Sequence, residues 1–417
     1  MPEQPHAILF TGFEPSGDDH AAAVIAELKA RQPDLPIYAW GGPKMQAAGA
    51  TIVERTGDSA VMGLPGLAKI QEHREINARI KAWLVEHPVA VHVPVDSPAA
   101  NFPICNIARA SGARVVHLVA PQVWAWGKWR VKKLRRLTDH VCCLLPFEEP
   151  WFRQRHVPAT FVGHPLFDHP LDTNRLDEII ADWPRAQTPG LNIALMPGSR
   201  PAEITKNFGL LIGVFNRLLR THPDALGVVA ATKAELEPQL RALAEEAGEP
   251  WPEQLRIEPS NTDATIRWSD FCLVVSGTVT LQIARQAKPM VAVYVWSKLM
   301  YRLVGRWLVT TPNFTLPNLI AGLRIVPELV PHFGGPEPMA TLATELLDSP
   351  ELAEKQRENL RGIVARFSGF SASAGCADII ERALLGEPLD TLSTAGTGAT
   401  APAAQRRTGT SPAATTE

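Results

Sequence analysis

Hydrophobic positions along this chain alternate between short continuous runs and longer stretches with helical spacing. Short runs bounded by turn-forming residues are typical of buried strands. In the first part of the chain the predicted strands are His6–Phe13, Ile37–Gly41, Val89–Asp96, Arg114–Ala120, His140–Pro146 and Ala159–Gly163. The stretches between them have helical spacing, beginning with an alanine- and leucine-rich one near His20. Strands that alternate with helices predict a parallel, doubly wound α/β sheet.

A second alternation follows a stretch rich in Pro, Asp, Thr and Gln between Asp168 and Gly190. Its predicted strands are Asn192–Met196, Leu226–Thr232, Leu255–Glu258, Phe271–Ser276 and Pro289–Val295. From Glu337 to Leu385 the pattern is helical and predicts no strand. Two halves of this kind predict two Rossmann-like domains that face a cleft.

The length of 417 residues and the 45% hydrophobic content are sufficient for two packed cores. We predict a first domain over 1–168, a linker over 169–190 and a second domain over 191–368. A C-terminal helix over 369–388 follows. The segment 389–417 consists mainly of Thr, Ala, Gly, Pro and Ser, and this composition predicts a disordered tail.

Charge and cysteine usage narrow the functional class. The formal net charge of −2 provides no broad basic face for nucleic acid, so we expect no nucleic-acid partner. The five cysteines lie mostly in apolar runs without metal-ligand spacing, which predicts reduced core residues in the cytosol. The N-terminus lacks the pattern of a signal peptide, and no apolar run is long enough to span a bilayer. We therefore expect a soluble or peripheral protein that faces the cytoplasm.

The turn between the first strand and helix of the second domain has the features of an anion site. Gly198 allows close backbone approach, Ser199 can donate a hydrogen bond, and Arg200 can contact phosphate oxygens as a fork. The helical pattern begins near Glu203, so free N–H groups and the helix dipole point at the same place. The alternative is an ordinary loop with a surface arginine.

A second turn has similar chemistry. Ser276, Gly277 and Thr278 follow another predicted strand and open a helix, with Gln282 about one turn further along. Two helix N-termini with hydroxyl groups and an arginine predict a site for a nucleotide diphosphate in the second domain.

Acidic residues gather after the strands of the first domain. Asp96 follows one predicted strand, while Glu14 and Asp18 lie in the loop after the first strand. A carboxylate in such a loop can act as general base, although an aspartate there also commonly caps a helix. His164 ends the last strand of this domain and can reach a ligand between the domains, although a lone histidine is more often structural.

Tryptophan and basic residues lie together between Pro121 and Leu137. Trp124 and Trp126 precede Lys128–Leu137, a stretch whose apolar positions have helical spacing among basic residues. This combination suits an anionic membrane surface or a phosphorylated lipid, and the alternative is a solvated basic face on a packed helix. A second apolar stripe between Leu299 and Leu308 fits either membrane contact or burial.

Ordered motifs extend this interpretation. They are Glu14-Pro-Ser-Gly-Asp18, Gly41-Gly-Pro-Lys-Met45, Ala60-Val-Met-Gly-Leu64, Pro121–Trp126, Leu145-Pro-Phe-Glu148, Phe161-Val-Gly-His-Pro165, Pro197-Gly-Ser-Arg200 with Glu203, Ser276-Gly-Thr278 and Leu316-Pro-Asn-Leu319. In these motifs and their order, the chain resembles bacterial lipid-A-disaccharide synthases from about Ile8 to Leu384.

This resemblance implies a GT-B glycosyltransferase that uses no metal or cofactor. The implied reaction transfers 2,3-diacylglucosamine from its UDP derivative to 2,3-diacylglucosamine 1-phosphate (lipid X). It forms the β-1,6 disaccharide of lipid A and releases UDP, with inversion. The family also implies peripheral association with the cytoplasmic surface of the inner membrane and an intertwined homodimer.

The resemblance assigns residues to each substrate. The UDP-sugar would contact Gly198, Ser199, Arg200, Glu203, Ser276, Gly277, Thr278 and Gln282. Lipid or acceptor would contact Met62 and Leu64 in an exposed apolar segment over Val61–Ile70, and also Trp124, Trp126 and Asn318. For catalysis, our own interpretation of the residues makes Asp96 the first choice for general base and Glu14 an alternative, with Glu14, Asp18 and His164 lining the cleft.

The chain departs from the family pattern in three places, one of them near Val330 and Pro331, where the glutamine that often follows Pro-Glu-Leu is replaced. Ala99 stands where the family usually has an aspartate thought to be important for catalysis. Gln282 stands where the family has a glutamate that would hold the ribose hydroxyls. Two alternatives therefore stand beside the synthase: a paralogue that acts on another UDP-sugar, and an inactive regulator that binds a UDP-lipid.

Overall fold

The computed structural model describes residues 6–56, 67–125, 127–184, 190–259, 261–298, 301 and 311–389. Predictions made for Met62, Leu64 and Trp126 lie outside these residues, as does the stripe between Leu299 and Leu308. Residues 390–417, in the predicted tail, also lie outside them.

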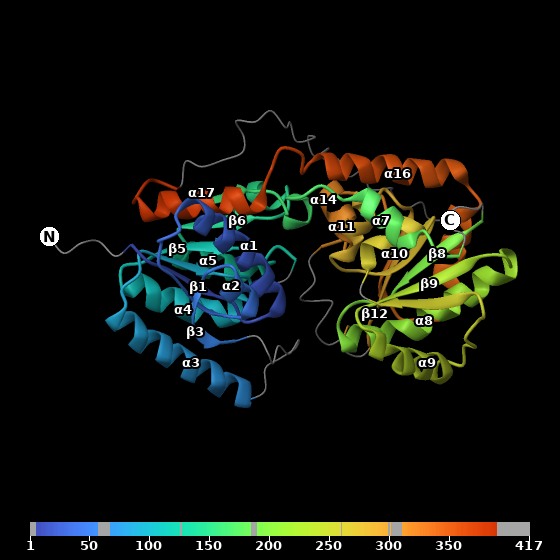
Figure 1. Ribbon diagram of the computed structural model, residues 1–417, viewed down its shortest axis with the longest axis horizontal. Helices are drawn as coiled ribbons and strands as arrows, with labels where there is room; N and C mark the ends of the chain where they lie inside the picture. The colour runs from blue at the N-terminus through green and yellow to red at the C-terminus, as the bar shows by residue number, and fades with distance from the viewer. Residues whose placement is uncertain are drawn as a thin grey trace, which may run out of the picture.

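The first domain contains a seven-stranded parallel sheet with the strand order β3-β2-β1-β4-β5-β6-β7 (Figure 1). Its strands are β1 (Ile8–Thr11), β2 (Ile37–Gly41), β3 (Thr51–Arg55), β4 (Val91–Pro94), β5 (Arg114–Leu118), β6 (His140–Cys143) and β7 (Ala159–Phe161). Its helices are α1 (Pro15–Arg31), α2 (Pro43–Ala47), α3 (Leu67–Glu86), α4 (Pro98–Ala110), η1 (Lys128–Arg130), α5 (Val131–Leu137), α6 (Glu148–Arg153) and η2 (Pro165–Phe167). The chain order reverses between β1 and β4, which makes this the switch point of the sheet.

The second domain repeats this plan with a six-stranded sheet in the order β10-β9-β8-β11-β12-β13. Its strands are β8 (Asn192–Met196), β9 (Leu226–Ala231), β10 (Leu255–Pro259), β11 (Phe271–Val275), β12 (Met290–Val295) and β13 (Glu328–His332). Its helices are α8 (Pro201–Thr221), η3 (Ala234–Leu236), α9 (Glu237–Glu246), α10 (Thr262–Trp268), α11 (Val279–Arg285), α14 (Leu316–Ala321), α15 (Glu337–Leu347) and α16 (Pro350–Ala365). Its switch point lies between β8 and β11.

The prediction of two doubly wound parallel sheets is confirmed, and most strand positions agree within a few residues. Two strands were missed, β3 and β13. Both lie at a sheet edge, where residues are only partly buried and the apolar pattern is weak. β13 also contains Pro331, and a proline in an apolar run argues against a strand unless it lies at an edge.

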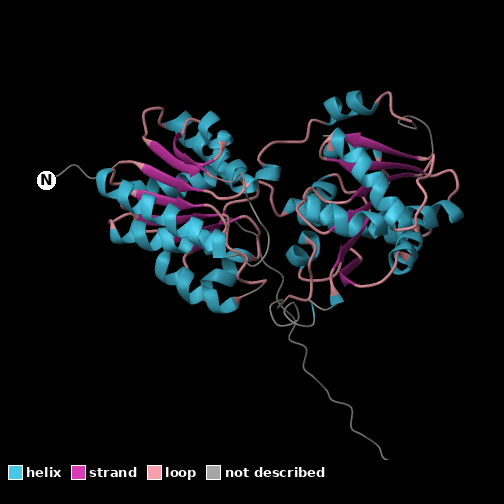
Figure 2. Ribbon diagram, turned by 90° about the horizontal axis from the view of Figure 1, so that it is seen from below, coloured by secondary structure: helices cyan, strands magenta, loops and turns pink. Residues whose placement is uncertain are grey.

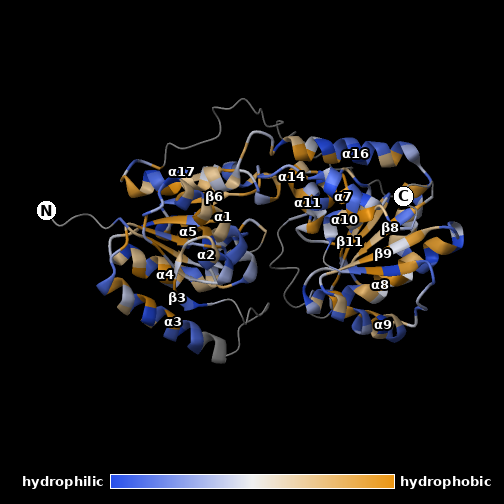
Figure 3. Cartoon of the chain, in the orientation of Figure 1, coloured by the Kyte–Doolittle hydropathy of each residue, from blue (hydrophilic) through white to orange (hydrophobic). Residues whose placement is uncertain are grey.

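Helices cover both faces of each sheet (Figure 2), which explains why the strands read as continuous apolar runs. Along β1, Ile8 and Phe10 pack in a cluster with α1, whereas Leu9 packs on the other face with Trp40. All are at most 1% exposed. In Figure 3 the described parts of α3 and α16 alternate between hydrophilic and hydrophobic residues, whereas the strands are mostly hydrophobic. The strands therefore contribute hydrophobic side chains to the core on both faces of the sheet.

The predicted linker contains α7 (Thr173–Ile180), so it is not a simple connecting segment. Leu176 and Ile180 of this helix are buried against Trp268 of α10 in the second domain. The polar composition between Asp168 and Gly190 concealed this helix, because only one narrow face of it is apolar.

The last helix, α17 (Ala372–Leu384), returns to the first domain and lies beside α1 (Figure 1). Asp168 stabilises its N-terminus, because the carboxylate accepts hydrogen bonds from the backbone of Ala372 at 2.7 Å and Ser373 at 3.0 Å. Leu389 is only 2% exposed and belongs to the same apolar cluster. The prediction that the disordered tail begins at Leu389 was therefore wrong at this residue.

The domains are also joined by a partly buried arginine. Arg285 on α11 donates to the backbone oxygen of Leu166 at 2.7 Å and forms an ion pair with Asp263 at 2.9 Å. Within the described residues, no helix is long and apolar enough to cross a bilayer.

Candidate active site

The loops after β1 and β4 meet at the switch point of the first sheet, since these strands are hydrogen-bonded neighbours. Glu14 precedes α1, and Ser97 precedes α4. The Ser97 hydroxyl donates to Glu14 Oε1 at 2.7 Å. Predicted site residues from loops more than eighty positions apart in the sequence are thus brought together.

Asp96 lies in the same pair of loops, immediately after β4. Burial raises the pKa of its carboxyl above the ordinary value of 3.8, and the Glu14 carboxylate raises it further. A backbone hydrogen bond from Ser97 and the Arg200 guanidinium act in the opposite direction on this pKa. Arg200, in the second domain, is thus among the charges that act on this carboxyl.

The structure corrects the role of Asp18. Its side chain is 7% exposed, and one oxygen accepts from the backbone of Gly42 at 3.1 Å and Met45 at 3.0 Å. The other oxygen accepts from the backbone of Lys44 at 3.0 Å. Three N–H donors hold this carboxylate over the start of α2, so it positions a loop and is not available as a base.

His164 is nearly buried at the start of η2, where its Nδ1 atom accepts from the backbone of Leu166 at 3.2 Å. Burial, assisted by the positive charge of His20 when protonated, lowers its pKa to about 4. The His20 and His164 rings have centroids 6.5 Å apart. A neutral ring that accepts a local backbone hydrogen bond matches the structural alternative for this histidine.

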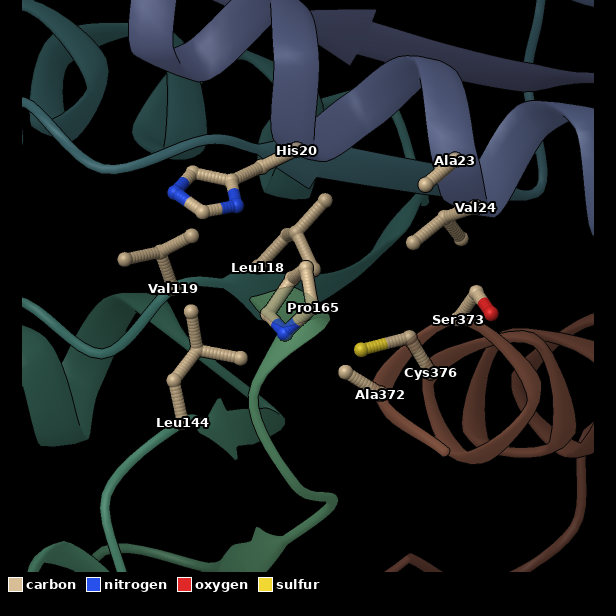
Figure 4. A pocket seen from close by; sticks show the side chains of 10 residues that line it. All are labelled: His20, Ala23, Val24, Leu118, Val119, Leu144, Pro165, Ala372, Ser373 and Cys376. Carbon is tan, nitrogen blue, oxygen red and sulfur yellow. The ribbon is translucent and has the colours of Figure 1, made fainter. Parts of the chain in front are cut away.

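A small cavity lies beside His20, between α1, the loop after β5 and α17 (Figure 4). Its volume is about 10 Å³, comparable to one water molecule. Apart from His20, Ser373 and Cys376, its lining is apolar. The cavity is too small for a sugar, so it is not the substrate site.

The loops after β8 and β11 meet at the switch point of the second sheet. Gly198 adopts a φ of +102°, which is favourable only for glycine, and Arg200 precedes the first turn of α8. The Arg200 side chain is 51% exposed, with its Nη1 atom 2.8 Å from Glu203 Oε1. Glu203 therefore holds the guanidinium at the helix N-terminus, where an anion would bind.

The second turn that was predicted to bind phosphate is also exposed. Gly277 and Thr278 are exposed at the start of α11, and Gln282 is partly buried one turn along. The Ser276 hydroxyl lies 3.5 Å from the backbone oxygen of Phe314. This turn and the loop after β8 lie at the same edge of the second sheet, because β8 and β11 are neighbouring parallel strands.

Asn318, for which contact with lipid or acceptor was predicted, lies inside the fold. Its side chain is fully buried, and its Oδ1 atom accepts from the backbone of Ile325 and Val326, both at 2.8 Å. Its Nδ2 group donates to the oxygen of Val326 at 2.8 Å. These contacts hold the connection between α14 and β13, so Asn318 supports the site from within the fold.

Trp124 is also turned into the protein. It is 7% exposed, packs edge-to-face on Phe147, and its indole donates to Glu148 Oε1 at 3.0 Å. The sequence analysis had predicted that Trp124 contacts lipid or acceptor. In this structure its ring faces the protein interior instead. Trp129, five positions later, is 71% exposed and lies next to the basic helix α5.

Glu148 is a buried carboxylate to which the sequence analysis assigned no role. Its Oε2 atom accepts from the backbone of Leu144 at 3.1 Å and Leu145 at 3.0 Å. Burial raises its pKa to about 7, and the charge of Asp96 contributes to this shift. Its position at the end of the motif Leu145-Pro-Phe-Glu148 was the available sequence signal.

All five cysteines are buried with free thiols, so the prediction that they are core residues is confirmed. Among the described residues, no group of three or more His, Cys, Asp or Glu side chains is arranged to hold a metal ion.

Solved structures with low sequence identity share this two-domain fold. The glycotransferase of kitacinnamycin aligns with a TM-score of 0.60 at 18% identity, covering 92% of this chain and all of that chain. UDP-GlcNAc 2-epimerase from Neisseria meningitidis, solved with UDP-GlcNAc, aligns with a TM-score of 0.58 at 15% identity, covering 91% and 100%. MurG from Acinetobacter baumannii gives 0.57 at 14%, with the same coverage. The fold is that of the GT-B glycosyltransferases.

Sequence comparison defines the family. Residues 8–372 match the model of the lipid-A-disaccharide synthetase family. Lipid-A-disaccharide synthase from Azotobacter vinelandii is 36% identical over 386 residues, covering 90% of this chain and 98% of the relative. The enzyme of that name from Geobacter sulfurreducens is 31% identical over 380 residues, covering 90% and 96%. The chain belongs to this family of glycosyltransferases.

Proposed function

We propose that this protein transfers 2,3-diacylglucosamine from its UDP derivative to 2,3-diacylglucosamine 1-phosphate, forming the β-1,6 disaccharide of lipid A and UDP. Family membership supports the choice of substrates. The observation that carries the proposal is that the candidate base and the candidate phosphate ligand each lie at the switch point of a sheet. Asp96 follows β4 in the first domain, and Arg200 follows β8 in the second.

The second domain binds the UDP-sugar in this proposal. Arg200 contacts the diphosphate, and the N-terminus of α8, with Gly198 and Ser199, supplies backbone and hydroxyl donors. The exposed turn at Ser276, Gly277 and Thr278 contacts the same diphosphate, while Gln282 reaches the ribose through neutral hydrogen bonds. Glu203 keeps the guanidinium in place before the donor arrives.

The first domain supplies the base. Asp96 removes the proton from the acceptor hydroxyl as its oxygen attacks C1 of the donor sugar from the side opposite the diphosphate. The new C–O bond forms as the bond from C1 to the phosphate oxygen breaks, and UDP leaves with the electron pair. Direct displacement inverts the anomeric centre. Arg200 and the start of α8 stabilise the charge that develops on the diphosphate.

Glu14 supports this base through its hydrogen bond with Ser97, and its negative charge keeps the proton affinity of Asp96 high. Asp18 and His164 have positioning roles, consistent with their internal hydrogen bonds. No step needs a metal ion or an organic cofactor.

The proposal includes peripheral binding to the cytoplasmic surface of the inner membrane. An exposed surface that we call the basic patch supports it, because indole and basic side chains suit anionic lipid headgroups. The basic patch consists of Lys128, Trp129, Lys132, Lys133, Arg135 and Arg136, all exposed. A homodimer is part of the proposal on the family resemblance alone, and light scattering tests it.

The direct experiment is a transfer assay with both lipid substrates. We expect the wild-type protein to form the disaccharide, and Arg200→Ala to lose donor binding and turnover together. Asp96→Asn should bind UDP normally and lose turnover. If the wild-type protein binds UDP but forms no disaccharide, the synthase proposal is wrong.

Ala99 and Gln282 favour a second candidate, a diverged relative that acts on another UDP-sugar or only binds a UDP-lipid. Ala99 is exposed in the first turn of α4, three residues after Asp96, so an aspartate there fits without burial. A large gain in turnover for Ala99→Asp indicates an impaired synthase. Turnover with another UDP-sugar, or none with any, favours the second candidate.

A further inference from the structure

A buried set of hydrogen bonds lies beneath the Asp96 turn and is not used by the chemistry above. Asn101, on the first turns of α4, is fully buried. Its Nδ2 group donates to the backbone oxygens of Val95 at 3.0 Å and Asp96 at 2.9 Å. Its Oδ1 atom accepts from the Thr11 hydroxyl at 2.7 Å. The amide thus uses both of its N–H donors and its oxygen.

Thr11 and His92 fix which way this amide points. Because the Thr11 hydroxyl donates its only proton to Asn101, its oxygen accepts from His92 Nε2 at 2.9 Å. This requires the His92 tautomer with hydrogen on Nε2. Thr11 and His92 are both fully buried, so water cannot replace these bonds without opening the domain.

The carbonyl groups that Asn101 binds belong to the two peptide groups that flank the Cα atom of Asp96. Their orientations determine the backbone angles of Asp96. These angles are unusual, with φ at +43° for Asp96 and +37° for Ser97. Residues other than glycine rarely adopt this backbone conformation. Two such residues in succession persist only when the surrounding structure holds them.

We propose that Asn101 is a positioning residue, which keeps the Asp96 carboxylate directed at the acceptor hydroxyl by holding both neighbouring peptide groups. Thr11 and His92 hold the Asn101 amide in turn. Asn101 itself touches no substrate. The inference rests on the proposed function, because it takes Asp96 as the general base.

The first test is Asn101→Ala in the transfer assay. We expect kcat to fall about tenfold to a hundredfold, since a misplaced reacting group is costly. The KM for the UDP-sugar should stay within about twofold, because the donor binds in the other domain. Thermal unfolding confirms that the variant is folded at the assay temperature. A folded Asn101→Ala variant with wild-type kcat overturns the inference.

A rescue experiment separates the turn from general packing. In the Asn101→Ala background, Ser97→Gly should restore part of kcat, because glycine adopts a positive φ without side-chain strain. Ser97→Ala is the matched control, because it also removes the hydroxyl that bonds Glu14 but keeps the Cβ atom. Equal kcat in the two double variants contradicts a role in holding the turn.

Thr11→Val provides a second variant of nearly the same shape, in case Asn101→Ala does not fold. It removes the hydroxyl between Asn101 and His92, and we expect a smaller fall in kcat with unchanged KM. Wild-type kcat for Thr11→Val argues against the inference. Asp96→Asn separates a failure of the proposed function from a failure of the positioning role. If this variant retains wild-type turnover, the assignment of Asp96 as general base is wrong. If Asp96→Asn is inactive while folded Asn101→Ala is fully active, only the positioning role fails.

Discussion

At the scale of single residues, Asp96 lies in surroundings that oppose its ionisation. Burial and the Glu14 charge raise the pKa of its carboxyl above 3.8, and Arg200 only partly offsets this. A general base works in its ionised form, so turnover should fall as pH decreases through this raised pKa. Asp96→Asn should lower kcat by a factor of about a hundred to ten thousand.

The pH dependence of kcat/KM measures this. Asp34→Asn is the control, because Asp34 is exposed in the turn before β2 and should leave the profile unchanged. An acid limb that persists unaltered in residual Asp96→Asn activity contradicts the assignment of Asp96.

Gly198 provides a test on the donor side. A Cβ atom at this position would lie 2.8 Å from Glu203 Oε2, and the φ of +102° disfavours any side chain. Gly198→Ala should therefore displace Glu203 and the arginine that it holds. We expect UDP affinity, measured by calorimetry, to fall about tenfold or more, equivalent to about 1.4 kcal/mol.

Gly362→Ala is the matched control for this substitution. Gly362 lies within α16, and no atom lies within 4 Å of the position that its Cβ would take. It should keep wild-type UDP affinity and gain up to about 1 kcal/mol of stability from higher helix propensity. Unchanged UDP affinity in Gly198→Ala would show that this turn does not hold the diphosphate.

Residue types predicted the chemistry of the site better than the role of each residue. The sequence placed three charged residues in loops that follow strands, and the structure has them there: Glu14, Asp96 and Arg200. Asp18 was assigned to catalysis and Asn318 to lipid or acceptor. Both instead bind backbone groups, about twenty-five and eight positions away respectively. Such partners depend on how loops fold together, which a single sequence does not specify.

At the scale of elements, Glu148 joins the loop that contains Trp124 to the end of β6. The carboxylate accepts the Trp124 indole and two backbone N–H groups. Glu148→Gln keeps the shape but leaves only one acceptor oxygen, so at least one buried N–H group loses its partner. We expect the free energy of unfolding to fall by about 1–3 kcal/mol.

Urea unfolding measures this loss. Glu358→Gln is the control, because Glu358 is exposed on α16 and such surface changes usually alter stability by at most about 0.5 kcal/mol. Equal stabilities for the Glu148→Gln and wild-type proteins would mean that Glu148 does not hold this loop.

Elements buried on both faces were predictable, because their apolar runs are continuous. The edge strands β3 and β13 were not, since partial burial leaves mixed patterns. The return of α17 to the first domain was not visible either. Its helical pattern follows the second domain in sequence, and contacts with residues far away in the chain determine where it lies, among them Asp168 and the packing against α1.

At the scale of the whole molecule, buried histidines connect stability to pH. Burial lowers the pKa of His92 and His117, on neighbouring strands β4 and β5, to about 3, and their mutual repulsion contributes to the shift of His92. His140 and His164 have pKa values lowered to about 4, again mainly by burial. All four lie in the first domain, so that domain should be the first to unfold in acid.

The direction of this pH dependence follows from the difference in proton binding between the unfolded chain and the folded domain. The ordinary histidine pKa is 6.5, so between pH 6.5 and about 3 the unfolded chain binds protons that the folded domain does not. Stability is therefore complete above pH 6.5 and is lost as pH falls. One pKa unit corresponds to about 1.4 kcal/mol, so several kcal/mol should be lost by pH 4.

His117 is the most informative position, because neither ring nitrogen has a hydrogen-bond partner among the described residues. Its ring packs edge-to-face with Phe102, 6.2 Å between centroids. His117→Phe removes the titrating group and keeps an aromatic ring, so urea unfolding between pH 7 and 4 should show a smaller loss of stability. His222→Phe is the control, since His222 is partly exposed in the second domain. An equally steep loss for wild-type and His117→Phe proteins would exclude His117 as a source of the acid sensitivity.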